Sequence, residues 1–102
     1  MHERTHERTA LLTEIELTSA SGRREARISD LSLGGCFVDT IVTARVGEDV
    51  SLRLGVNSDH PIELSGKIAY ILDGFGFGIG FDELTDEIRT DLAKYLEPVA
   101  VQ

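Results

Sequence analysis

Alternation of apolar and polar residues in short segments constrains the fold of this chain more than any other feature of its sequence. In residues 11–18, Ile15 and Leu17 would lie on one face of a strand and Glu14 on the other, and residues 50–56 repeat the pattern. Side chains two positions apart in a β-strand share a face. These segments therefore predict strands with one buried face.

Four further segments have the same character. They are residues 24–32, 35–39, 62–72 and 74–81. We expect Ile28 and Phe37 inside the fold, and Tyr70 and Leu72 on the inner face of the long strand after Pro61. Gly66 interrupts the alternation of that strand and predicts a bulge or a sharp bend.

The run GFGFGIGF, at residues 74–81, superficially resembles a nucleotide-binding loop. Its glycines recur at every second position, which fits neither G-x-G-x-x-G nor a P-loop, and no lysine follows. The run instead predicts a closing strand. One face would be aromatic and buried, and the other would be bare, so that another backbone can pack closely against it.

The period changes after residue 82. Apolar residues then recur every three or four positions, at Leu84, Ile88, Leu92, Tyr95 and Leu96. Thr85 or Asp82 can cap the start of a helix, and Pro98 stops it. Strands with no helix between them, followed by one late helix, predict a mainly β fold: a six-stranded antiparallel barrel with one C-terminal helix. A chain of 102 residues has room for one such domain.

The net charge and the cysteine content limit the classes of function and the cellular compartment that we expect. A net charge of −8 argues against binding to DNA, RNA or anionic membranes. No segment approaches the roughly 20 apolar residues needed to cross a bilayer, and no signal peptide is present, so we expect a cytoplasmic protein. The single cysteine, Cys36, agrees with a reducing compartment and is expected to be a small buried apolar residue.

The basic residues are unevenly distributed. Arg4, Arg8, Arg23, Arg24 and Arg27 precede residue 30, and acidic residues dominate the rest of the chain. If the first segment folds back beside residues 23–27, an acidic protein acquires one local basic site. Such a site suits a small anionic ligand better than a polymer.

The first residues match the zinc-protease pattern H-E-x-x-H through His2, Glu3 and His6. That chemistry needs both histidines on a preformed helix and a third ligand, whereas a chain end is usually loose. The surroundings of Cys36 and His60 contain no base for a nucleophile. We therefore expect no metal site and no enzyme.

A second pattern is Asp30-x-Ser32-x-x-Gly35, where a strand enters a glycine-bearing turn. Asp30 and Ser32 would lie side by side on one face. Gly35 would allow a positive φ or the close approach of a ligand. Taken alone, the pattern is typical of a turn held by local side-chain bonds.

The two patterns together are more specific. Arg4-x-x-x-Arg8, then Asp30-x-Ser32-x-x-Gly35, a series of strands, the glycine-rich strand and a closing helix resemble the PilZ domain over nearly the whole chain. The resemblance implies a PilZ-type barrel at residues 11–98, a flexible N-terminal arm at 1–10 and a tail at 99–102. It also implies a receptor for cyclic di-GMP with no further cofactor. The implied ligand-binding residues are Arg4, Arg8, Asp30, Ser32, Gly34 and Gly35.

The resemblance suggests a cyclic di-GMP effector or adaptor that relays its signal to a protein partner, in processes such as motility or biofilm formation. The alternative is a ligand-independent PilZ-like interaction protein in a pilus or motility assembly. Family members often carry an extra arginine directly before the first arginine of the arm. Glu3 occupies that place here, which favours one ligand per site. Because the arm begins near Met1, we expect a stand-alone adaptor, monomeric or dimeric.

Overall fold

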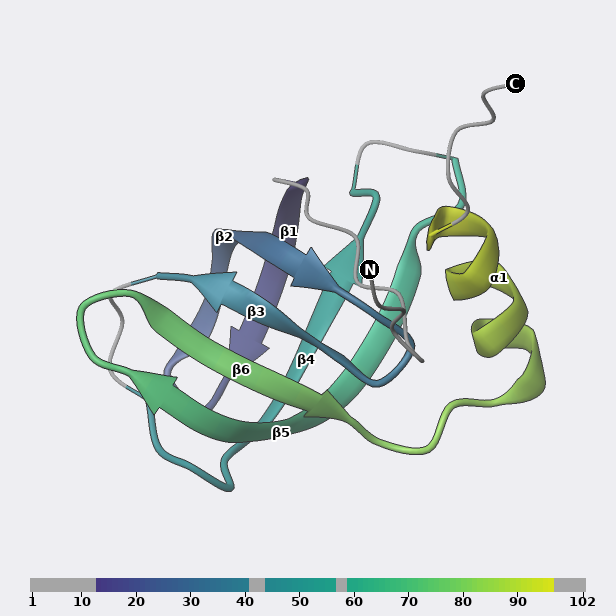
Figure 1. Cartoon of the computed structure of the whole chain (residues 1–102). Coiled ribbons are helices and arrows are strands. Elements are labelled where there is room, and N and C mark those ends of the chain that lie inside the picture. Colours follow the sequence, from purple (N-terminus) through teal and green to yellow (C-terminus); the bar gives the residue numbers. More distant parts are fainter. Residues whose placement is uncertain (1–12, 41–43, 57–58, 97–102) are drawn as a thin grey trace, which may run out of the picture.

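A computed structural model describes residues 13–40, 44–56 and 59–96 (Figure 1). The elements, in chain order, are β1 (Thr13–Ser19), β2 (Gly22–Leu31), β3 (Gly35–Asp39), β4 (Asp49–Leu54), β5 (Ile62–Leu72), β6 (Gly76–Phe81) and α1 (Asp86–Leu96). The expected six strands and late helix are therefore confirmed. No helix in the described part of the chain is both long and apolar enough to span a bilayer.

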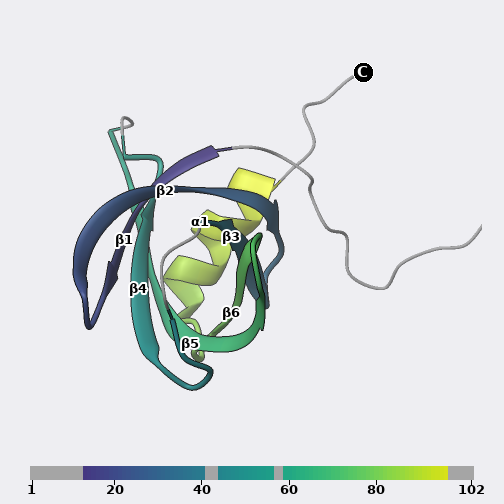
Figure 2. The same ribbon diagram turned by 90° about the vertical axis from the view of Figure 1, so that its left-hand side faces the viewer.

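The strands form a closed antiparallel barrel in the order β1-β2-β3-β6-β5-β4. The strand β6 closes it, because it pairs with β3 on one side and β5 on the other. Figure 2 looks along the barrel and shows α1 across its far end. The turn between β2 and β3 lies at this same end of the barrel in Figure 1.

The barrel interior is apolar, and no buried residue of the described segments is polar or charged. Every strand contributes to it, and the least exposed of the large side chains are Ile15, Leu17, Ile28, Leu31, Leu54, Ile68, Leu92 and Val38. On β4 and the first part of β5 buried residues alternate strictly with exposed ones, as the sequence pattern predicts. Burial of apolar area is thus the main source of stability.

The helix α1 seals the end of the barrel through Leu92, which is fully buried in the core. Its N-terminus is capped by Thr85, whose Oγ1 accepts a hydrogen bond from the backbone N–H of Ile88 at 3.1 Å. Asp82, the other predicted cap, instead accepts a bond from the hydroxyl of Ser65 at 3.3 Å. Asp86 and Glu87 in the first turn complement the helix dipole.

Two bulges change which residues face inward, and they correct two expectations. In the β5–β6 pair the register shifts between Ile68 and Tyr70. The bulge is therefore not at Gly66, and it places Tyr70 and Leu72 outside, with exposed fractions of 46% and 49%. One extra residue in a strand reverses the facing of everything after it.

The second bulge lies in the β2–β3 pair, between Ile28 and Asp30. It lets Ile28 and Leu31 both point inward, opposite Val38 and Cys36 respectively. Phe37 consequently lies on the outer face and is only half-buried, contrary to expectation. The expected burial of Cys36 is confirmed.

The glycine-rich strand has one apolar face and one bare face, as expected, although fewer aromatic residues are buried. Phe77 and Ile79 lie in the core and Phe81 is half-buried. Phe75 lies in the turn before β6 and is 71% exposed. The Cβ of any residue replacing Gly76 would overlap the carbonyl oxygen of Val38, so the strand must be bare here.

Candidate functional site on the outer face of the barrel

The segment from Asp30 to Gly35 forms the end of β2 and the turn into β3. Asp30 is the outward residue after the bulge, and it lies directly across from Phe37 of β3. The next residue, Leu31, is fully buried, so Ser32 returns to the outer side. Asp30 and Ser32, both half-buried, therefore share the outer face as the sequence predicts.

Ser32 holds the turn together. Its backbone N–H donates to the carbonyl oxygen of Gly35 at 2.9 Å. Its hydroxyl accepts from the N–H of Gly34 at 3.2 Å and donates to the same Gly35 oxygen at 3.4 Å. A serine hydroxyl has two acceptor lone pairs and one proton. Ser32 can therefore accept one more bond without disturbing the turn, and it can redirect its long 3.4 Å bond to an anion.

The glycines of the turn have different roles. Gly35 does not have the positive φ that was one of its expected uses. A Cβ at this position would overlap the carbonyl oxygen of Ile79 in β6, so glycine is required for the two strands to pair. At Gly34 a Cβ would meet only the hydroxyl of Ser32, at an ordinary 3.9 Å. The carbonyl of Gly34 accepts a bond from Phe81 N–H at 2.9 Å.

Behind this surface lies Cys36, whose thiol faces the core. Burial, and secondarily the negative charge of Asp30, raise the pKa of Cys36 to about 12. At pH 8 only about one thiol in 10⁴ would then be a thiolate, the reactive form. The cysteine thus packs in the core as a small apolar residue.

We expect Cys36 to resist a thiol reagent such as 5,5′-dithiobis(2-nitrobenzoic acid) in the folded protein at pH 8. It should react stoichiometrically once denaturant unfolds the chain, because both burial and the nearby charge are then lost. Absorbance of the released thiolate measures the reaction. Complete labelling of the native protein within minutes would contradict the buried position.

The three arginines of β2 do not form one basic cluster. Arg23 points outward and pairs with Glu16 at 3.7 Å. Arg24, its neighbour in β2, is exposed and lines a small hollow with Leu17 and Ile68. Arg27 lies on the outer face, opposite Asp39. Of these three arginines, Arg27 is the one placed on the outer face near Asp30.

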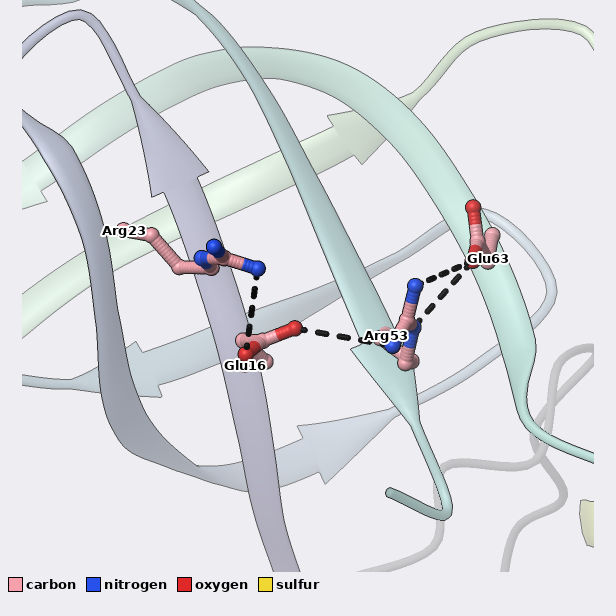
Figure 3. Close-up of polar contacts among 4 residues, drawn as sticks. All are labelled: Glu16, Arg23, Arg53 and Glu63. Carbon is pink, nitrogen blue, oxygen red and sulfur yellow. Dashed lines mark hydrogen bonds and ion pairs between the residues drawn. The ribbon is translucent and has the colours of Figure 1, made fainter.

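An ion-pair network occupies the outer face of the strands β1, β4 and β5 (Figure 3). The guanidinium of Arg53 contacts Glu16 at 3.7 Å and Glu63 at 2.8 Å, and Glu16 also holds Arg23. The three residues Glu16, Arg53 and Glu63 are directly paired across neighbouring strands. Exposed ion pairs of this kind contribute at most about 1 kcal/mol each to the free energy of unfolding. Arg23 and Arg53 are thus paired with acidic residues of the barrel and are not part of the candidate site.

The remaining predicted residues lie outside the described part of the chain. These are Arg4 and Arg8 of the arm, together with Glu3 and the zinc-like pair His2 and His6. Among the residues that are described, no group of three or more His, Cys, Asp or Glu side chains is arranged to hold a metal ion.

Aromatic residues of this face were not anticipated as site residues. Cross-strand pairing forms a row of directly opposed residues that starts at Asp30 and continues through Phe37 and Gly78 to Tyr70. The rings of Phe37 and Tyr70 are stacked, with centroids 6.2 Å apart and an interplanar angle of 29°. The signal that could have revealed them is the alternate glycines, since a bare strand face can be covered by rings from its neighbours.

Comparison with known proteins assigns this chain to a protein family. The profile of the PilZ domain matches residues 2–97. The chain belongs to the PilZ domain family. PilZ domains are receptors for cyclic di-GMP and act as ligand-binding or adaptor domains. The expected family and its six-stranded barrel with a C-terminal helix are thus confirmed.

Solved PilZ structures share the fold at low sequence identity. The PilZ domain of CeSA from a cellulose-synthesizing bacterium has 20% identity and a TM-score of 0.69, over 87% of this chain and 93% of that one. The PilZ domain of YcgR from Escherichia coli, solved with c-di-GMP, has 16% identity and a TM-score of 0.72, over 92% and 88%.

The MrkH–c-di-GMP complex from K. pneumonia has 15% identity and a TM-score of 0.71; the match covers 94% of this chain but 52% of MrkH. No curated protein matches the sequence of this PilZ domain.

Proposed function

We propose that this PilZ domain binds cyclic di-GMP on the outer face of its barrel, between the β2–β3 turn and the arginine arm. The observation that carries the proposal is the position of Asp30 and Ser32, which the bulge and the turn hold together on that face. The same chain carries the Arg4-x-x-x-Arg8 pattern. Two solved structures that contain this fold, the PilZ domain of YcgR and MrkH, are described with c-di-GMP, which supports this ligand.

The chemistry of the ligand matches these residues. Cyclic di-GMP presents two guanines and two phosphates. The guanidinium groups of Arg4 and Arg8 can donate two bonds to guanine O6 and N7, stack on the base, or pair with phosphate. The carboxylate of Asp30 suits the N1–H and N2–H₂ donors of guanine, or it orients an arginine. Ser32 suits a phosphate oxygen or a base amine.

A ligand bound on the convex outer face of the barrel would stay open to solvent unless a second segment covers it. One hollow of the described surface lies elsewhere and is lined by residues 20–21 and 44–48. In this proposal the arm, residues 1–10, covers the ligand by closing over it. Closure orders the arm and changes the surface that a protein partner meets, so that the domain acts as an adaptor without catalysis.

Calorimetric titration with cyclic di-GMP tests the proposal. We expect the wild-type protein to bind, and Arg8→Ala and Asp30→Ala each to weaken binding by about tenfold to a hundredfold, because a good bidentate contact to a base contributes about 1–3 kcal/mol. Arg53→Ala is the matched control: it removes the same charge from β4, where Arg53 pairs with Glu63, away from the β2–β3 turn. It should bind like the wild type.

The same titration measures the stoichiometry, which we expect to be one ligand per site because Glu3 disfavours a second stacked nucleotide. Binding must also raise the melting temperature, since a ligand specific to the native state stabilises it. A flat titration with no thermal shift would refute the proposal and favour a ligand-independent interaction protein.

A further inference from the structure

The outer face of β6 carries no side chains at Gly76 and Gly78, yet its backbone is buried there. Gly76 and Gly78 are buried although both lack side chains. A Cβ on Gly78 would overlap the ring of Tyr70, and a Cβ on Gly76 would lie 3.1 Å from a ring carbon of Phe37. The two rings, from the strands on either side, therefore lie over the glycines of the strand between them.

This aromatic floor, defined as the rings of Phe37 and Tyr70, remains accessible from outside. Tyr70 is 46% exposed, and its outward position is imposed by the bulge in β5. A partly exposed tyrosine ring can offer a π-face to a planar ligand.

The floor is continuous with the candidate site. Asp30 and Phe37 are direct cross-strand partners, so their backbones lie about 5 Å apart. Tyr70 lies two strands beyond Phe37, in the same row. A planar base whose edge is held by Asp30 would therefore extend over the two rings, within the reach of a dinucleotide.

We infer that Phe37 and Tyr70 form a stacking surface for one guanine base of cyclic di-GMP, which extends the binding site from the β2–β3 turn across β6 to β5. The inference rests on the proposed function. Asp30 fixes the edge of the base, and the two rings support one of its faces. Stacking of bases on aromatic side chains is favourable for any base, so the floor supplies affinity while Asp30 supplies selectivity.

Substitutions at Tyr70 distinguish base stacking from a purely structural role in which the side chain only covers Gly78. Tyr70→Leu keeps an apolar side chain over Gly78 but removes the π-face, and Tyr70→Phe keeps the ring. Leucine should raise the dissociation constant for cyclic di-GMP by about tenfold, whereas phenylalanine should leave it within about twofold. Equal melting temperatures of the free proteins would show that both variants fold.

Fluorescence gives a readout that a structural role would not move. The protein has two tyrosines and no tryptophan. In Tyr95→Phe the remaining emission comes from Tyr70, and cyclic di-GMP should quench it in proportion to binding. Tyr70→Phe leaves Tyr95 of α1 as the matched control, whose signal should fall only by the absorption of the added nucleotide.

The outcomes distinguish the two proposals. Wild-type binding with unchanged affinity in Tyr70→Leu and no specific quenching of Tyr70 would overturn the stacking surface while leaving the proposed function intact. No binding by the wild-type protein would overturn both. Weakened binding in Tyr70→Leu, together with quenching of Tyr70 and not of Tyr95, supports the inference.

Discussion

Gly35→Ala is expected to lower the free energy of unfolding by about 3 kcal/mol, the upper end of what overpacking usually costs. The added Cβ would overlap the Ile79 carbonyl, a backbone atom that cannot rotate away, and the next contacts are Ile79 C at 3.2 Å and Gly80 Cα at 3.4 Å. β3 and β6 would have to separate where the barrel closes. For a domain of this size the melting temperature should fall by about 12–24 °C.

The adjacent glycine provides the control for this experiment. Gly34→Ala adds the same methyl group, one residue earlier, where it meets only the Ser32 hydroxyl at 3.9 Å. Its φ is not positive, so alanine should leave stability unchanged or raise it slightly by restricting the unfolded chain. Equal melting temperatures of the two variants would show that the close approach of β3 and β6 is not as described.

Gly35 also shows how a motif residue can be required for two reasons. The sequence pattern assigns it to the ligand site, whereas its contacts assign it to the barrel. Loss of ligand binding in a Gly35 variant would therefore not identify a ligand contact. Binding by Gly35→Ala has to be measured at low temperature, where the folded fraction is known, before any role at the site is inferred.

Leu92→Ala is expected to destabilise the domain by about 2–5 kcal/mol, the usual range for truncating a fully buried leucine. Leu92 is the one helix residue with no exposed surface, and it packs in the core at the end of the barrel. Urea denaturation followed by circular dichroism measures the change. The exposed Lys94 in the same helix provides a control, because Lys94→Ala removes a surface side chain and should shift the midpoint little.

The Leu92 experiment also tests whether the helix and the barrel unfold together. A single transition that moves to lower urea with an unchanged slope is the expected result. A loss below about 1 kcal/mol, or a separate early transition of the helix signal, would contradict a core that depends on α1.

Much of the fold follows from local patterns, and the wrong predictions for Tyr70 and Leu72 have one physical origin. Alternation at Val50, Leu52 and Leu54 predicts burial correctly, because nothing interrupts the pairing of β4. Alternation fails at Tyr70 and Leu72, because the bulge before them arises from the pairing of β5 with β6. A strand's own residues do not specify where its partner gains or loses register.

Phe37 illustrates a different ambiguity. It lies between Cys36 and Val38, so three consecutive apolar residues leave the phase of β3 undefined. The phase is set by pairing with β2, where Leu31 meets Cys36. Size favours burying the phenylalanine, but register overrides it, and the displaced ring then becomes available on the outer face.

The candidate site was predictable as far as its turn. Asp30 and Ser32 on one face follow from their spacing, and the turn bonds of Ser32 follow from serine chemistry. The roles of Arg4 and Arg8 stay predictions, since both residues lie outside the described part of the chain. The alternate glycines indicate a strand face that neighbouring rings could cover, but they do not identify Phe37 and Tyr70. That assignment depends on the bulge in the β5–β6 pair and on the pairing of β3 with β6, which is distant in sequence.

Closure of the barrel restricts how another protein can recognise this domain. Each of the six described strands is hydrogen-bonded to a neighbour on both sides. A peptide therefore finds no open sheet edge along which to add itself as an extra strand. Any complex must instead be specified by outward side chains and by the segments that flank the barrel, so that changes in those residues can alter the choice of partner while leaving the barrel itself intact.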